Sequence, residues 1–219
     1  MKDYFETLTK VKLFEGIEES ELQSLLSCLD AKTMHYEKGQ TVFLSGDSTR
    51  QFGIVLSGQV QVVHDDYYGN RSILSNIETG NLFAESFAFS GLKALPVSVI
   101  TTTESELMFI DCQKLAVPCG RSCGFHGRLI QNMLGIVSLK NIKLTQKIEF
   151  TSKRTTREKL LAYLSAIATE SKSSQFCIPF NRQELADYLS VERSAMSAEL
   201  SKLRDDGVIK FNKNQFELL

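Results

Sequence analysis

The segment from about Thr33 to Asp111 constrains the fold most, because its apolar residues come in short runs separated by turn signals. β-Branched and aromatic residues, which favour strands, dominate the runs TVFL, FGIVL, VQVV, RSILSNI, VSVI and ELMFI. Several short strands at such regular spacing are typical of an antiparallel sandwich or barrel. We therefore expect a jelly-roll-like β roll. Its turns are expected to use a positive φ at Gly39, Gly46, Gly58, Gly69 and Gly80.

One part of this segment departs from the strand pattern. The stretch 81–99, NLFAESFAFSGLKALPVSV, has room for one short helix before a Gly and a Pro, after which the strand pattern resumes. We interpret a helix inserted in a small β roll as the mark of a ligand pocket, and we expect an effector to bind there.

Residues 122–150 carry a long helical pattern with a heptad repeat. The seam residues step along the chain by four and three residues in turn, and one of them, Asn141, is polar. Such a seam predicts a dimerisation helix in a two-stranded coiled coil, in which a buried Asn pair fixes the register. The alternative is a single amphipathic core helix. The seam consists of Ile130, Leu134, Val137, Asn141, Leu144 and Ile148.

The stretch 180–209 predicts two short helices joined by a tight break. Asn181 and Glu184 have the spacing of a capping box at the start of the first helix. The second helix begins at about Arg193, and the VIKFNKNQFEL that follows it reads as a β-hairpin with Lys213 at its tip. This order predicts a winged helix-turn-helix. The alternative is an ordinary helical hairpin.

The second of these helices carries small and polar side chains on one face. Small side chains let a helix lie deep in the major groove of DNA, and an Arg at its start can bind guanine through two hydrogen bonds. We therefore expect the segment to bind double-stranded DNA. The candidate contacts are Arg193, Ser194, Ser197, Ser201 and Arg204 on the helix and Lys213 on the hairpin.

Size and charge are compatible with this interpretation. The 219 residues suffice for two ordinary domains, and 42% apolar with 23% charged residues is usual for globular protein. The net charge is −1, but residues 151–219 hold 11 basic against 9 acidic residues, which permits a local DNA-binding face. No apolar run is long enough for a bilayer and no signal-peptide core is present, so we expect a cytoplasmic protein without a membrane partner.

The chain resembles the CRP/FNR family of bacterial transcription regulators over nearly its full length. The resemblance lies in YEKGQTVFLSGDSTRQFGIVLSGQVQVV, in the heptad helix and in NRQELADYLSVERSAMSAELSKL. It implies a homodimer on a pseudo-palindromic DNA site, with RNA polymerase as a further partner. The implied fold is α+β: a cyclic-nucleotide-binding-like effector domain (1–120), a dimerisation helix (121–150) and a winged helix-turn-helix domain (151–219).

The resemblance also assigns residues at the DNA interface. It places Arg182 and Gln183 at the edge of the groove, touching phosphate or base, and it matches Arg193 to the family's base-reading Arg. A lost Arg contact costs about 1–3 kcal/mol of discrimination between bases.

Three positions depart from the family pattern. Ser194 stands where an acidic residue often reads cytosine, and Ala198 stands where a third Arg is often found. Glu192 replaces a short cap such as Ser or Asp, and we expect it to cap the helix poorly. The target sequence therefore cannot be borrowed from better-known members.

Family members that bind cyclic AMP use a Glu for the ribose and an Arg–Ser pair for the cyclic phosphate. Glu85 matches the Glu, but ten residues later Leu95 replaces the phosphate Arg and is followed by Pro96. These two offer no cation, and Pro96 has no N–H. We therefore expect an effector other than cyclic AMP, in an apolar pocket. The alternative is that aromatic residues fill the core of the roll. The candidate pocket residues are Phe83, Glu85, Ser86, Phe87, Leu95 and Pro96.

The cysteines suggest a second kind of signal. Cys112, Cys119, Cys123 and His126 lie within 15 residues, and thiolate and imidazole ligands suit zinc, haem iron or an iron–sulfur cluster. Thiol redox chemistry is a further option. However, the spacing matches no standard metal site, and buried structural thiols are common. An odd total of five cysteines disfavours a disulfide framework.

Sequence features distinguish three functional classes of protein. The predicted wing and polar second helix favour a DNA-binding regulator. The alternative is a nucleotide-sensing regulatory module that acts through protein partners. An enzyme is disfavoured, because the sequence contains no P-loop, no nucleophile elbow and no convincing acid–base pair.

Overall fold

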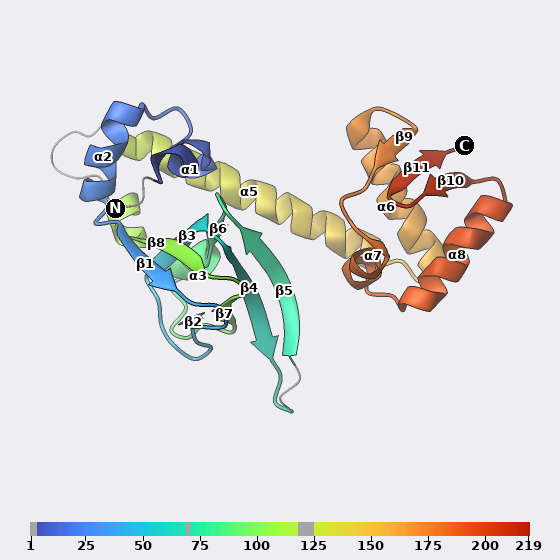
Figure 1. Cartoon of the computed structure of the whole chain (residues 1–219), viewed down its shortest axis with the longest axis horizontal. Coiled ribbons are helices and arrows are strands. Elements are labelled where there is room, and N and C mark those ends of the chain that lie inside the picture. The colour runs from blue at the N-terminus through green and yellow to red at the C-terminus, as the bar shows by residue number, and fades with distance from the viewer. Residues whose placement is uncertain (1–3, 69–70, 118–124) are drawn as a thin grey trace. The chain divides into compact units, whose positions relative to one another are not determined.

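The computed structural model describes residues 4–68, 71–117 and 125–219, and the fold is α+β, as predicted (Figure 1). These residues form two compact units, 1–138 and 139–219, each with its own apolar core. None of the helices in the described ranges is both long and apolar enough to cross a membrane.

The first unit is built on two antiparallel four-stranded sheets, as the short apolar runs predict. Their orders are β1-β8-β3-β6 and β2-β7-β4-β5. Val55 and Leu107 of one sheet cluster with Val60 and Val99 of the other, so side chains from both sheets make one core. The strands are β1 (Lys32–Tyr36), β2 (Thr41–Phe43), β3 (Gln51–Ser57), β4 (Gln59–Asp65), β5 (Arg71–Glu78), β6 (Leu82–Phe83), β7 (Ser98–Thr101) and β8 (Ser105–Asp111).

Two positions in this roll favour glycine for different reasons. At Gly53, a Cβ atom would overlap the buried ring of Phe83, so only glycine leaves room for that side chain. At Gly58, φ is +86° and the backbone of Glu104 and Ser105 lies close by, so both conformation and space favour glycine. The predicted positive φ is confirmed at Gly39, Gly46, Gly58 and Gly80, and Gly69 lies outside the described residues.

A helical layer packs beside the sheets. Buried leucines of its helices cluster with Phe52 and Ile110 of the sheet that contains β3 and β8. Asn132 of α5 joins the layer by donating hydrogen bonds to the carbonyls of Leu13 and Glu15, each at 2.9 Å. The layer consists of α1 (Phe5–Lys10), the 3₁₀ turn η1 (Lys12–Phe14), α2 (Glu19–Cys28), α4 (Cys112–Ala116) and the first half of α5 (Phe125–Thr151).

The inserted helix α3 (Glu85–Ser90) lies between β6 and β7, as predicted. Helix α5 runs without interruption for 27 residues and contributes to both units. Its buried apolar side chains are Leu129 and Met133 in the first unit and Phe150 in the second. Most of its remaining apolar residues are exposed: Leu134, Val137, Leu139, Ile142, Leu144 and Ile148.

The second unit combines three helices with a small sheet (Figure 1). The sheet has the order β10-β11-β9, so a third strand extends the predicted hairpin. That strand is only three residues long and owes its conformation to pairing with β11. The elements are α6 (Thr156–Ser171), β9 (Gln175–Cys177), α7 (Arg182–Leu189), α8 (Arg193–Asp205), β10 (Ile209–Asn212) and β11 (Gln215–Leu218).

Candidate functional site

Two helices of the second unit begin with capping boxes, and the one at Asn181 is the one predicted above. The Asn181 side chain accepts hydrogen bonds from the N–H groups of Gln183 and Glu184 at 2.9 and 3.0 Å. The Glu184 carboxylate in turn accepts from the Asn181 N–H at 2.7 Å. Thr155 and Glu158 make the same reciprocal pair at the start of α6. These caps satisfy N–H groups that would otherwise lack partners in the first turn.

Helix α8 is also capped, which corrects the expectation for Glu192. Its carboxylate accepts hydrogen bonds from the N–H groups of Ser194 and Ala195 at 2.9 and 2.7 Å, and from the Ser194 hydroxyl. Hydrogen bonds from Ser194, first through its side chain, lower the pKa of the Glu192 carboxyl below its ordinary value. The longer side chain still reaches the first turn, where the helix dipole favours a negative charge.

Contacts within the second unit hold the turn between α7 and α8. Ser190 adopts φ +52°, and the N–H of Val191 donates to the Ala186 carbonyl at 3.0 Å. The Lys159 ammonium of α6 donates to the carbonyls of Leu189 and Ser190, each at 3.3 Å. These contacts satisfy the C-terminal carbonyls of α7 and set the direction in which α8 begins.

An ion-pair network fixes the other end of α8 to α6. Arg157 donates to Asp206 at 2.8 Å and to Glu199 at 3.3 Å, and the hydrogen bond to Asp206 is the main cause of its raised pKa. Glu199 also lies 3.8 Å from Lys202. Sequence reasoning missed Arg157 and Lys159, because their partners lie 30 to 49 residues away and no local pattern connects them.

The outward face of α8 carries the predicted DNA contacts, but their side chains differ in availability. Arg193 is exposed, and its guanidinium makes no hydrogen bond or ion pair with any residue that the structure describes. The hydroxyls of Ser197 and Ser201 donate back to helix carbonyls at 2.9 and 3.1 Å. Arg204 is paired with Asp205 at 2.9 Å. Arg193 is therefore the cation on this face that is free to bind an external acceptor.

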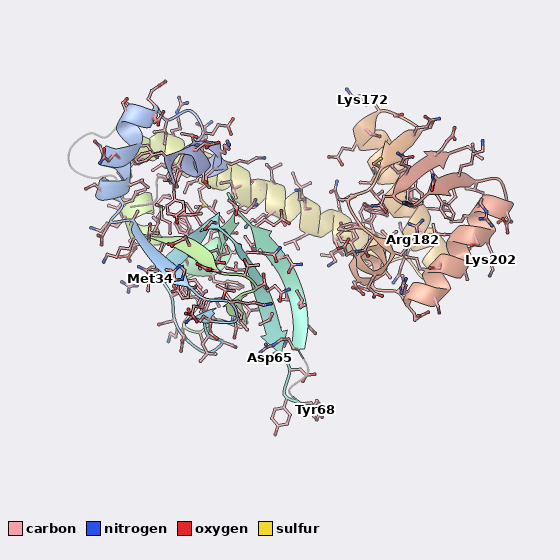
Figure 2. The ribbon with its side chains drawn as sticks, in the orientation of Figure 1. Met34, Asp65, Tyr68, Lys172, Arg182 and Lys202 are labelled. Carbon is pink, nitrogen blue, oxygen red and sulfur yellow. The ribbon has the colours of Figure 1, made fainter. Side chains whose placement is uncertain are left out.

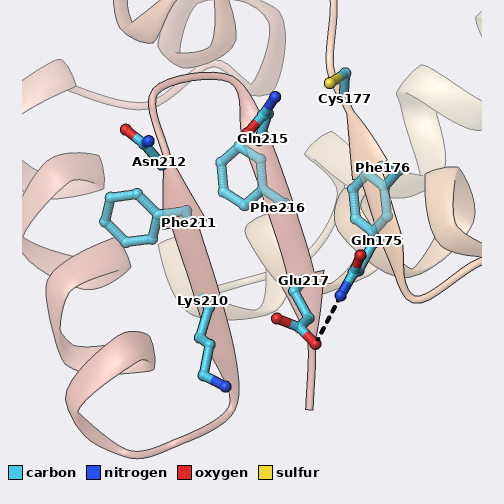
Figure 3. Close-up of a pocket in the computed structure, with 9 residues that line it drawn as sticks. All are labelled: Gln175, Phe176, Cys177, Lys210, Phe211, Asn212, Gln215, Phe216 and Glu217. Atoms are coloured by element: carbon cyan, nitrogen blue, oxygen red, sulfur yellow. Dashed lines mark hydrogen bonds between the residues drawn. The ribbon is translucent and has the colours of Figure 1, made fainter.

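The wing is the hairpin formed by β10 and β11, in which Asn212 pairs with Gln215 (Figure 3). Lys213, between these two strands, is exposed. The rings of Phe211 and Phe216 stack at 5.7 Å, and Phe176 of β9 continues the row at 6.3 Å. The three strands border a surface pocket of about 540 Å³, and two of its lining residues, Gln175 and Glu217, share a hydrogen bond of 3.2 Å.

Arg182 and Gln183 do not extend from the domain as free side chains. The Arg182 guanidinium lies over the rings of Phe211 and Phe216 and donates to the Lys213 carbonyl at 2.9 Å. Figure 2 labels Arg182 in the second unit. Gln183 donates to the Asp187 carboxylate at 2.8 Å. The Arg182 side chain therefore faces the wing, and its expected contact at the groove edge stays a prediction.

The predicted effector residues differ in burial and surroundings. Phe83 is buried against the rings of Phe43 and Phe109, and Leu95 is buried in the roll. Glu85 is buried and accepts a hydrogen bond from the Ser86 hydroxyl at 3.2 Å. Phe87 is half-buried and Pro96 is exposed. Phe83 and Leu95 pack inside the roll, so at these two positions the side chains fill the core instead of lining a pocket.

A different cavity lies next to α3. It is a mostly apolar groove of about 540 Å³ formed by α3, α4 and the first half of α5. Glu85 and Ser86 are the two predicted effector residues that line it. Three residues of the predicted dimer seam complete its α5 side. The lining consists of Glu85, Ser86, Phe89, Ser90, Leu115, Ala116, Ile130, Met133, Leu134 and Val137.

The predicted cysteine site is described only in part, since Cys119 and Cys123 lie outside the described residues. Cys112 is buried, its thiol donates to the Ala88 carbonyl at 3.3 Å, and burial raises its pKa. His126 is buried and its Nε2 lies 3.2 Å from the Lys114 carbonyl. Within 4–68, 71–117 and 125–219, no three ligand-type side chains gather as a metal site would require.

Comparison with known proteins finds one family match in each of the two units of the chain. A family model described as a cyclic nucleotide-binding domain matches residues 33–117, and one described as a Crp-like helix-turn-helix domain matches residues 158–219. The chain is 23% identical to the nitrogen fixation regulation protein FixK of Bradyrhizobium diazoefficiens over 194 residues, which cover 86% of this chain and 78% of that protein. It is 24% identical to the transcriptional activator protein FnrL of Cereibacter sphaeroides over 184 residues, or 80% and 71% of the two chains.

Solved structures show the same fold at low sequence identity. The c-di-GMP responsive global regulator CLP of Xanthomonas campestris superposes with a TM-score of 0.60 at 19% identity, covering 92% of this chain and 99% of that one. DNR from Pseudomonas aeruginosa gives a TM-score of 0.52 at 21% identity, with 100% and 95% coverage.

Proposed function

This chain belongs to the CRP/FNR family of DNA-binding transcription regulators, and from that premise we propose that it binds a pseudo-palindromic DNA site as a cytoplasmic homodimer without enzymatic activity. Residues 1–120 sense an effector, 121–150 dimerise and 151–219 bind DNA. The observation that carries the proposal is the exposed, unpaired Arg193 at the start of a helix that is capped and tied at both ends.

The DNA-binding step follows from this helix. With α8 in the major groove, Arg193 donates two hydrogen bonds to a guanine, and Ser194, Ser197 and Ser201 lie close to neighbouring bases. Arg204 exchanges its bond to Asp205 for a phosphate. Gln183 and Lys213 contact the DNA backbone on either side of the groove.

The exposed seam on α5 supports the dimer. Leu134, Leu144 and Ile148 are each at least 60% exposed, which is unusual for leucine and isoleucine on a helix without a partner. Pairing two copies along this seam covers the three side chains. It also presents two α8 helices to successive major grooves, as a pseudo-palindromic site requires. RNA polymerase is the partner through which such a dimer regulates transcription.

The effector is an apolar molecule rather than a cyclic nucleotide. The groove beside α3 has apolar walls and offers Glu85 and two serines as its polar groups, which suits a small hydrophobic ligand with one hydrogen-bonding end. Among the described residues none that lines it is basic, so a phosphate would lose water without gaining a cation from them. The Cys112 thiol is engaged with a carbonyl, which favours a structural role over redox or metal sensing.

The proposal is tested by selecting binding sites from random duplex DNA with the purified full chain. We expect an enriched inverted repeat that contains guanine in each half. Arg193→Ala should weaken binding to that site by about 1–3 kcal/mol per half-site, while the matched charge loss Lys12→Ala in the other unit should have no effect at equal salt. Failure to enrich any sequence, or unchanged selectivity of Arg193→Ala, would contradict it.

A further inference from the structure

Arg182 occupies an unusual place for an arginine at the edge of a DNA-binding helix. Its guanidinium carbon lies 5.0 Å from the ring centre of Phe211 and 5.2 Å from that of Phe216, which are paired across the two strands of the wing. Its Nη2 donates to the Lys213 carbonyl at the wing tip, at 2.9 Å. We propose that Arg182 is a positioning residue that holds the wing in its DNA-binding orientation and does not itself contact DNA.

The wing tip is a place where such support matters. Lys213 adopts φ +51°, a conformation that costs a non-glycine residue energy. The Lys213 carbonyl is held by Arg182, and the Asn214 carbonyl accepts the Ile178 N–H at 2.9 Å. Both peptide groups of the two-residue turn are therefore tied to the segment that leads into α7. An untied two-stranded hairpin would be only marginally stable.

The environment of Arg182 argues against a direct phosphate contact. The side chain is half-buried, its Nη1 is buried without a partner among the described residues, and burial lowers its pKa. An arginine that binds DNA has to present free donors to it, as the exposed Arg193 does. The faces of Phe211 and Phe216 supply the attraction that offsets part of the lost hydration.

The same contacts join the wing to both helices. The Arg204 guanidinium carbon of α8 lies 5.9 Å from the Phe211 ring, so this ring is flanked by one arginine from each helix. A displacement of the wing would therefore have to break contacts to α7 and α8 together. The result is a Lys213 side chain presented at a fixed place relative to Arg193.

The inference rests on the proposed DNA-binding role, but its first test needs no DNA. Hydrogen exchange of the wing amides, residues 209–218, is measured in the free full-length chain. Arg182→Met keeps the apolar stem over the two rings and removes the charge and the donors, and Arg182→Lys keeps the charge without the planar stacking group. Gln183→Met, an exposed neighbour, is the matched control.

We expect wing amides to exchange about five-fold faster in Arg182→Met, the factor set by one ordinary hydrogen bond, and to be unchanged in Gln183→Met. Arg182→Lys should fall between Arg182→Met and the wild type. In DNA binding, Arg182→Met should weaken affinity in the wild-type background and have little effect in Lys213→Ala.

Two results would overturn the inference. One is unchanged wing exchange in both Arg182 variants. The other is a full effect of Arg182→Met in the Lys213→Ala background with a salt slope lower by about one, which marks a lost phosphate contact. If the chain bound no DNA at all, the exchange result would still decide the positioning role.

Discussion

The Glu192 carboxylate accepts a hydrogen bond from the Ala195 backbone N–H at 2.7 Å and thereby caps the helix that carries Arg193. Glu18 occupies the equivalent position before α2, with a similar extended backbone, yet its side chain makes no cap bond. The difference shows that the cap on α8 is a specific contact of this helix.

This cap predicts a pH-dependent contribution to stability. The pKa of Glu192 is lowered in the folded chain, so its stabilising effect is present above the ordinary value of 4.5 and is lost as pH falls through the folded pKa. Glu192→Gln should be less stable than the wild type at pH 7, and the gap should close toward pH 3. Urea unfolding across this range measures it, with Glu18→Gln as control. Parallel stability curves for Glu192→Gln and the wild type would refute the role.

Substitutions at Ala186 and Ala198 distinguish an effect on core packing from an effect on DNA recognition. Ala186 is fully buried in the core of the second unit, and Ala198 is exposed on α8. Ala186→Leu should overpack this core and destabilise the unit by about 1–3 kcal/mol. Ala198→Leu should leave stability within about 0.5 kcal/mol of the wild type and impair DNA binding. Denaturant unfolding and binding titrations on both variants test this, and equal losses of stability would count against it.

Leu144 and Leu139 provide a matched test of the dimer seam. Both leucines are exposed on α5, at 60% and 46%, but five residues of helix turn them about 140° apart. Leu144→Asp should weaken dimerisation at least about ten-fold, because a buried charge would face its own copy, whereas Leu139→Asp should not. Sedimentation equilibrium distinguishes them. Equal behaviour of the two variants would place the interface elsewhere.

Cyclic AMP should not stabilise the chain. Leu95 is buried and its N–H already donates to the Asp47 carbonyl at 2.8 Å, so neither its side chain nor its N–H is available to a ligand. A ligand present at 1,000 times its Kd adds about 4 kcal/mol to the free energy of unfolding. We expect no shift in Tm at about 1 mM cyclic AMP, whereas a shift of several degrees would follow from tight binding. A rise in Tm that grows with cyclic AMP concentration would reject the expectation.

Much of the fold could be predicted from patterns of neighbouring residues in the sequence. The capping boxes at Asn181 and Thr155, the positive φ of the turn glycines and the bounds of α8 all depend on a few consecutive residues. Backbone geometry acts over this range, so the order of residues is sufficient to predict them. The short strands of the roll followed from the same kind of periodicity, except β9, whose partner strand lies about 40 residues away.

By itself, then, the sequence determined the antiparallel roll with its inserted helix, the heptad seam on α5 and the helix whose first residue is Arg193. Only the tertiary structure decided that Arg182 turns to Lys213, that Arg157 ties α6 to Asp206, and that Phe83 and Leu95 fill the roll. The physical reason is the range of the interactions. Helix and turn signals act between neighbours along the chain, whereas burial and long-range hydrogen bonds depend on which elements pack together.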